Sequence, residues 1–286
     1  MKYWWLALLI VAIFAAETYL VWQMRNNRKA CMITLTVLSS VLLIYKTVEF
    51  AYYRIADKGL YPVEFSHITY FVLGVTVCFG IKKMRAFAGI CSVLAGFGYV
   101  VAACFSPGSI ITEASAVFYI PLAIIQHEVL WFAGCLLLFN VDKYSIKDIW
   151  VPLVGVFTMI IFSVLVSQRI IYKDFASYDN MIIIKIVTGR IVEYLIGAEN
   201  LTVAKQAITA VVLIVAAVGI FVSFYFINNA AFKKREKKGS VIKGENFEIG
   251  IVPFIKSAVA KKCRHVCVAT SDSQAEVSAD VADKEE

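Results

Sequence analysis

Ionisable side chains occur inside the apolar segments of this chain, some of them at helical spacing. Two pairs, Lys46 with Glu49 and Glu64 with His67, are separated by three residues, so each pair would share a helix face. His127 lies in a later apolar segment. A charge inside hydrocarbon is costly, so such groups usually face the bundle interior and pair with one another. These residues are therefore the first candidates for acid–base chemistry, proton relay or binding of a polar ligand.

The expected depths of these groups coincide. At 1.5 Å per residue from the expected span ends, Lys46 lies about 12 Å, His67 about 8 Å and His127 about 11 Å below the outer boundary. Glu17 is the exception, because the same rise puts it about 20 Å from the outer end of its span. The shared depth predicts a polar pocket in the outer third of the membrane. His127 and Glu128 are adjacent, so one would line the pocket and the other would reach a neighbouring helix.

Tyrosines flank one member of this layer. Tyr45 precedes Glu49 by four residues and Tyr52 follows it by three, which adds hydroxyl groups and an aromatic wall on the same side of the helix. The expected binding residues are Lys46, Glu49, Glu64, Glu128, Tyr45 and Tyr52.

Each of these residues also has a purely structural interpretation. Lys46 and Glu49 would serve as an ion pair that ties helices together. Glu64 would be a carboxylate at a helix start, where the helix dipole favours negative charge. The two intramembrane histidines would be separate, hydrogen-bonded core residues. The coincidence in depth favours a joint site over these single explanations.

The composition indicates the elements that must hold these groups. Hydrophobic residues make up 60% of the 286 residues and charged residues 17%, with a mean hydropathy of +0.75. A soluble domain of this length would carry more charge. The apolar residues come in blocks of about twenty, which is the length of a membrane-spanning helix. The cations cluster between and after these blocks, which excludes a nucleic-acid-binding role for the net charge of +7.

We therefore predict an all-α, polytopic membrane bundle of about seven helices over residues 1–232, followed by a basic and then disordered cytoplasmic tail at 233–286. An amphipathic helix at 181–196 is expected on the outer surface, with a re-entrant segment as the alternative. The expected spans are 3–22, 31–53, 63–81, 86–105, 119–139, 149–167 and 207–228.

Loop charges and small residues add detail to this bundle. With the N-terminus outside, the inner flanks hold 13 Lys and Arg and the short outer segments hold 3, so the pattern predicts an N-out, C-in topology. Ala88, Ser92 and Gly96 recur every four residues in the fourth span, a spacing that lets another helix approach closely.

Two stretches resemble a known family. YPVEFSHITYFVLGVTV at 61–77 and QHEVLWFAGCLLLF at 126–139 are similar to the motif-bearing spans of the YwaF-like family of bacterial integral membrane proteins. That family resembles, at a distance, a eukaryotic multispan acyltransferase that uses a cysteine and a histidine at these two places. The resemblance implies a multi-pass protein of the bacterial cytoplasmic membrane and suggests acyl transfer.

The correspondence can be followed residue by residue. Pro62 matches the proline of the family motif, Ser66 falls at the cysteine position and His127 matches the later histidine. Glu64 replaces a motif histidine, while His67 appears beside the nucleophile position. A serine in place of the cysteine needs a stronger activating base.

The first functional hypothesis is a lipid-handling enzyme such as an acyltransferase. Ser66 would be the nucleophile and His67 or His127 its base. His127 is the better base, because His67 is the direct neighbour of Ser66 and points about 100° away on the helix. Glu64 or Glu49 would orient the base, in the manner of a catalytic triad.

Other classes of function remain open at this stage. A transporter or binding protein would use Lys46, Glu49 and the histidines to hold a small polar solute or to relay protons. The simplest alternative is a structural membrane protein without catalysis. No cofactor motif is present, and the expected partners are membrane lipids and a small polar or lipid substrate. A metal-dependent hydrolase would use His67, His127, Glu64 and Glu128.

Overall fold

The protein is a bundle of apolar helices. The computed structural model describes residues 4–55, 62–105, 119–171, 185–186, 188–197 and 200–237, and these contain no β-strand. Within these ranges, six helices are long and apolar enough to cross a membrane, and a seventh apolar helix is shorter. The predicted all-α bundle of about seven helices is thus confirmed. The α-helices are α1 (Trp4–Met24), α2 (Arg28–Ile55), α3 (Phe65–Cys78), α4 (Arg85–Phe105), α6 (Tyr119–Leu136), α7 (Trp150–Ser167), α9 (Glu193–Ile196) and α10 (Val203–Lys237).

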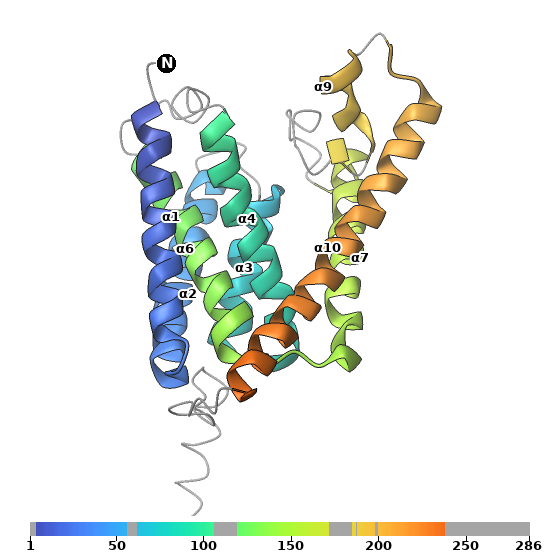
Figure 1. Ribbon diagram of the computed structural model, residues 1–286. Coiled ribbons are helices and arrows are strands. Elements are labelled where there is room, and N and C mark those ends of the chain that lie inside the picture. The colour runs from blue at the N-terminus through green and yellow to red at the C-terminus, as the bar shows by residue number, and fades with distance from the viewer. Residues whose placement is uncertain are drawn as a thin grey trace, which may run out of the picture.

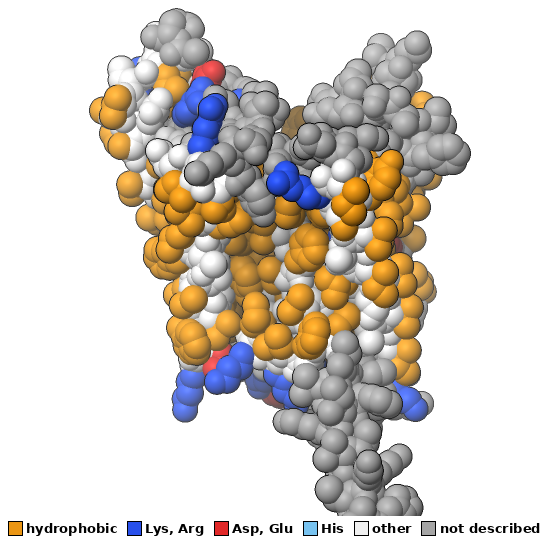
Figure 2. Space-filling view, turned by 180° about the vertical axis from the view of Figure 1, so that it is seen from behind, with side chains coloured by type: hydrophobic (Ala, Val, Ile, Leu, Met, Phe, Trp, Pro, Cys, Tyr) orange, Lys and Arg blue, Asp and Glu red, His pale blue; other side chains and the backbone are white. Residues whose placement is uncertain are grey.

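The helices are arranged in two groups. Helices α1, α2, α3, α4 and α6 pack together, while α7 and α10 stand beside them and diverge from the bundle toward the end where α9 lies (Figure 1). We call the other end, which carries residues 24–28, 80–85, 141–150 and 233–237, the basic end. Figure 2 shows an apolar band over the middle of the molecule with Lys and Arg gathered at its rims. This distribution is that of a protein surrounded by hydrocarbon.

The close contact of α4 with α6 depends on small residues. A Cβ atom added at Gly96 would lie 2.8 Å from the carbonyl oxygen of His127, and one added at Gly134 would lie 2.7 Å from the backbone nitrogen of Val93. Ala88 and Ser92 are fully buried on the same helix. The close approach predicted from the small-residue spacing is confirmed, and it brings the backbone of α6 directly against α4 at His127.

Helix α3 is shorter than the span expected at 63–81. It covers 14 residues, or about 21 Å of a hydrocarbon core of about 30 Å. Gly80 adopts a φ of 68°, which ends the helix. The backbone N–H groups of Gly80 and Ile81 donate to the carbonyls of Val77 and Thr76, so the last turn stays hydrogen-bonded.

Helix α10 is longer than the span expected at 207–228. It has 35 residues, which corresponds to about 52 Å. The basic residues at 233–237, which we expected to begin the tail, are its last turns, and residues 238–286 lie outside the described part of the chain. The inclined helix carries its C-terminal end beneath α6 (Figure 1). As a result, cations from the end of the chain meet the bundle.

The segment expected to be one amphipathic helix at 181–196 is broken where it is described. Lys185 and Ile186 are helical, but Gly189 has a φ of 71° and leads into a 3-10 turn at Arg190–Val192. The single turn of α9 follows. A residue in the left-handed region cannot continue an α-helix. The described part of this segment is therefore not one continuous helix, despite the helical spacing of its polar residues.

Candidate functional site

Two residues of helix α2 form an ion pair with each other. The Nζ of Lys46 lies 2.6 Å from Oε2 of Glu49, and the hydroxyl of Tyr45 donates to Oε1 of Glu49 at 2.9 Å. Glu49 lies four residues after Tyr45 and three after Lys46, so its carboxylate can reach both side chains along the helix. The Lys46 side chain is only 5% exposed. Its charge is therefore balanced by a carboxylate and not by water.

Tyr70 on α3 lies at the centre of the polar layer, and sequence reasoning missed it. The Nζ of Lys46 is 4.6 Å from the centre of the Tyr70 ring, a cation–π arrangement. The rings of His67 and His127 lie 6.5 and 6.1 Å from the Tyr70 ring, between ring centres. Tyr70 is 1% exposed. Its spacing of three from His67 was the signal that would have put it on the same helix face.

His127 is held by aromatic rings and by its own helix. The Tyr99 ring stacks on it with centres 4.1 Å apart and planes tilted by 11°. Its Nδ1 lies 2.8 Å from the carbonyl oxygen of Ala123. Because a carbonyl only accepts, Nδ1 carries a hydrogen, and Nε2 of the neutral ring is left as the acceptor. His127 can therefore take up a second proton at Nε2.

Three expected site residues lie less centrally. Tyr52 is 58% exposed, and its ring packs edge-on against Tyr53, so the aromatic wall expected on both sides of Glu49 forms on one side. Glu64 is exposed at the N-cap of α3, and its side chain makes no capping hydrogen bond. Ser66 is half-buried on α3, and no hydrogen bond joins it to His127. The structure thus brings Lys46, Glu49, Tyr45, His67 and His127 together more closely than these three.

Glu128 faces away from this cluster toward α1. Its side chain is buried, and no N–H group of the described residues donates a hydrogen bond to its carboxylate oxygens. Its electrostatic partner is the carboxyl group of Glu17. Two carboxylates this close in a low-dielectric interior repel, and a shared proton or a bound cation relieves that repulsion. Glu17, the outlier in depth, therefore belongs to a second acidic site beside His127.

A further polar network at the basic end joins distant parts of the chain. The carboxylate of Asp142 accepts hydrogen bonds from Arg28 at 2.9 Å and from Arg85 at 2.8 Å, one through each oxygen. The side chain of Asn228 on α10 donates to the carbonyls of Leu138 and Asp142, at 2.5 and 2.9 Å. These bonds fasten α2, α4 and α10 to the end of α6.

The end of α6 is itself irregular at this network. Residues Leu137–Val141 form a π-helical turn, which frees backbone carbonyls that an α-helix would use. The carbonyl of Val141 accepts from Arg28, and the side chain of Asn140 donates to the carbonyl of Val21 at 2.7 Å. Sequence reasoning counted the arginines only as topology signals and did not foresee that they pair inside the protein.

Tyr144 also belongs to this network. Its backbone N–H donates to the Asn228 side chain at 2.8 Å. Burial, reinforced by the negative charge of Asp142, holds the pKa of the Tyr144 phenol well above its usual value. The group therefore stays neutral and acts as a packed structural element of the basic end.

The described residues do not form a metal centre. His67, His127, Glu64 and Glu128 are all described, yet no three His, Cys, Asp or Glu side chains of the described part gather as ligands. This arrangement does not favour the metal-dependent hydrolase that we considered from the sequence.

Comparison of the chain with models of known protein families, with curated proteins and with solved structures gives no match. The resemblance to the YwaF-like family stays a prediction from the two motif-bearing spans. The functional argument therefore depends on the geometry of the site.

Proposed function

We propose that the protein is a proton-coupled membrane carrier or binding protein of small polar solutes. The observation that carries the proposal is the meeting of Lys46, His67 and His127 around the Tyr70 ring. These groups come from α2, α3 and α6. Ionisable residues inside a membrane bundle are costly and usually mark ion or proton pathways.

The cluster contains side chains that can exchange protons. Histidine is the side chain whose unperturbed titration falls nearest neutral pH, and Nε2 of His127 is the available acceptor. Glu128, the residue after His127 on α6, pairs with Glu17 of α1, so the bundle holds a second group of side chains that can share a proton. The Lys46–Glu49 pair supplies both signs of charge for a polar solute.

The test is proton movement in sealed liposomes that contain the purified protein and an internal pH-sensitive dye. A potassium diffusion potential drives protons inward, and wild-type protein should acidify the lumen faster than empty liposomes do. His127→Ala should slow this by at least about tenfold, because proton transfer through a positioned side chain is lost. Ile125→Ala, on the lipid-exposed side of the same helix, is the matched control and should retain the wild-type rate. A wild-type rate equal to that of empty liposomes, or one unchanged by His127→Ala, contradicts the proposal.

A second candidate, a lipid-handling enzyme, is favoured by a different observation. An apolar crevice of about 170 Å³ separates α4 from α7 and α10, and Phe65, the residue before Ser66, lines it. Dry apolar cavities of about 150 Å³ take up hydrocarbon. An acyl chain in the crevice would bring an ester group into the region of the α3 start.

A labelling experiment tests the lipid-handling enzyme independently of proton movement. A serine-reactive probe with an acyl chain should label the wild-type protein, and Ser66→Ala should abolish the labelling. Ser92→Ala, at a fully buried serine of α4, is the control that should leave the labelling unchanged. Equal labelling of wild type and Ser66→Ala removes the enzyme from consideration.

A further inference from the structure

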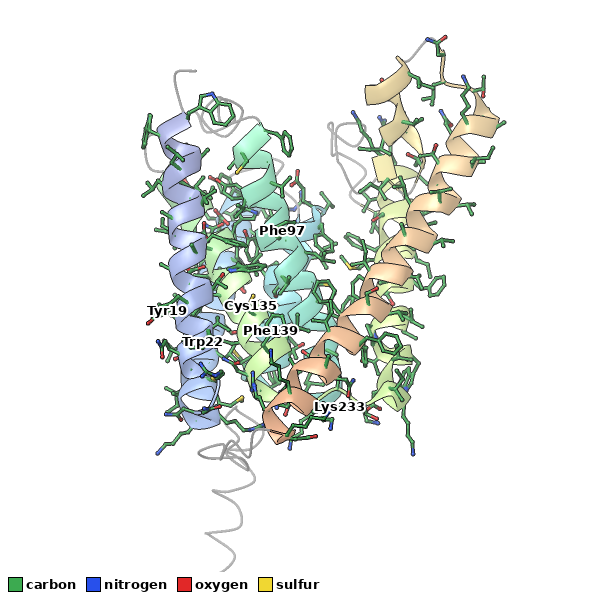
Figure 3. The ribbon with its side chains drawn as sticks, viewed as in Figure 1. Tyr19, Trp22, Phe97, Cys135, Phe139 and Lys233 are labelled. Atoms are coloured by element: carbon green, nitrogen blue, oxygen red, sulfur yellow. The ribbon has the colours of Figure 1, made fainter. Side chains whose placement is uncertain are left out.

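A cavity of about 390 Å³ opens between the ends of α1 and α10 at the basic end. Its volume falls within the range of small-molecule sites. Figure 3 shows Trp22 on α1 and Phe139 on the π-helical turn after α6 in this region. We call it the basic pocket, and the lining residues that matter are Thr18, Trp22, Arg25, Asn140, Lys234 and Arg235.

Three cationic side chains line the basic pocket. Arg25, Lys234 and Arg235 all line it, and none of the three forms an ion pair with a residue that the structure describes. Glu236, the nearest acidic residue in sequence, pairs with Lys143 at 2.9 Å instead. Three cations that share one cavity repel one another, so an anion bound among them would be stabilised.

Neutral groups hold the two arginines in position. Arg235 donates to the carbonyl of Arg25 at 3.1 Å, to the side chain of Asn140 at 2.9 Å and to the carbonyl of Phe139. Arg25 donates to the carbonyl of Trp22 at 2.7 Å, and its guanidinium lies 3.7 Å from the Trp22 ring centre. These contacts fix the guanidinium groups, and none of them supplies a negative charge. A pre-positioned guanidinium suits the planar, bidentate recognition of phosphate.

We propose that the basic pocket binds the phosphate of an anionic phospholipid. The residues next to the cations indicate that the phosphate belongs to a lipid and is not a free ion. Trp22 is 54% exposed, and Tyr19 and Leu20 of α1 are exposed beside it, so the pocket opens onto an apolar helix face at the level where interfacial aromatic residues meet headgroups. Basic pockets between membrane helices bind anionic headgroups in this way. The acyl chains would run along α1, and the phosphate would enter between Arg25 and Lys234.

The experiment measures lipid binding to the full-length protein by native mass spectrometry from detergent. The probes are dioleoylphosphatidylglycerol, dioleoylphosphatidylcholine and inorganic phosphate. The wild type should retain the anionic lipid in preference to the neutral one, and millimolar inorganic phosphate should not displace it. Lys234→Glu should reduce retention of the anionic lipid by at least about tenfold, since it replaces an attractive charge with a repulsive one.

Two further variants make the result decisive. Lys237→Glu makes the same change three residues further along α10, at an exposed lysine outside the pocket, and should reduce retention by less than about twofold. The double variant Arg25→Gln with Lys234→Gln removes two cations without introducing an acid, and it should also lose the anionic lipid. It covers the case in which the charge reversal in Lys234→Glu prevents folding. Each variant is checked for folding by its elution as a single species in size-exclusion chromatography. Equal retention of the two lipids, equal loss in Lys234→Glu and Lys237→Glu, or displacement by inorganic phosphate overturns the proposal.

Discussion

The ammonium group of Lys46 lies 4.6 Å from the centre of the Tyr70 ring. The two residues belong to α2 and α3, and both are buried. Lys46 is thus shared between the carboxylate of Glu49 on its own helix and an aromatic face on the next one. The contact converts an intrahelical ion pair into a link between helices, and it orients the ring that His67 and His127 approach.

Replacement of Tyr70 should separate the role of its ring from that of its hydroxyl. Tyr70→Phe keeps the cation–π contact and should change the free energy of unfolding by less than about 1 kcal/mol. Tyr70→Ala removes the ring from a buried position and should cost about 3–5 kcal/mol. Unfolding in sodium dodecyl sulfate, followed by circular dichroism, measures both. Equal stability of the two variants would show that the ring contact contributes nothing.

The Lys46–Glu49 pair should behave as a buried ion pair in a double-mutant cycle. Lys46→Met leaves the carboxylate of Glu49 uncompensated and should destabilise the protein by about 3–5 kcal/mol. Adding Glu49→Gln should recover part of that loss, because no isolated charge remains. The exposed pair of Lys143 with Glu236 is the control, and its cycle should give a coupling of about 0–1 kcal/mol. A Lys46→Met single variant as stable as the double variant would contradict this account.

Gly96 and Gly98 provide a matched pair on α4. A methyl group at Gly96 would meet the backbone of α6 at His127, whereas one at Gly98 would meet nothing within 4 Å. Gly96→Ala should therefore destabilise the protein by about 1–3 kcal/mol through overpacking. Gly98→Ala should be neutral or stabilise by up to about 1 kcal/mol, since alanine favours the helix.

The same substitution should also disturb the candidate site. Gly96→Ala moves α6 relative to α4, so the stacking of Tyr99 on His127 would loosen. Proton flux should fall in Gly96→Ala and persist in Gly98→Ala. Undiminished flux in both variants would show that the stacking is not needed for the proposed activity.

Asp142 should be the most sensitive residue at the basic end. Asp142→Asn leaves Arg28 and Arg85 without their shared carboxylate and should cost about 3–5 kcal/mol in the free energy of unfolding. Asp148→Asn, at a half-buried carboxyl group without an ion pair in the described structure, should cost less than about 1 kcal/mol. Detergent unfolding of both variants checks the prediction, which fails if the two losses are alike.

The number and approximate positions of the apolar helices followed from the sequence alone. Apolar blocks of span length have few alternatives in hydrocarbon, where every backbone N–H and C=O must be satisfied within the segment. The Lys46–Glu49 pair also followed from sequence, because two residues three apart on one helix remain neighbours whatever the helix packs against. The close approach of α4 to another helix was predictable from Gly96 for a similar local reason.

Contacts between helices were decided only in three dimensions. Tyr70 with Lys46, Glu17 with Glu128, and Asp142 with Arg28 and Arg85 each join residues that are far apart along the chain. Helices that are apolar on most of their surface carry little periodic signal for which face turns inward, so their rotation is set by side-chain packing. Arg235 reaches the bundle only because α10 continues nine residues beyond its expected end at 228 and inclines beneath α6. The site therefore depends on how these helices rotate and cross, which local spacing does not specify.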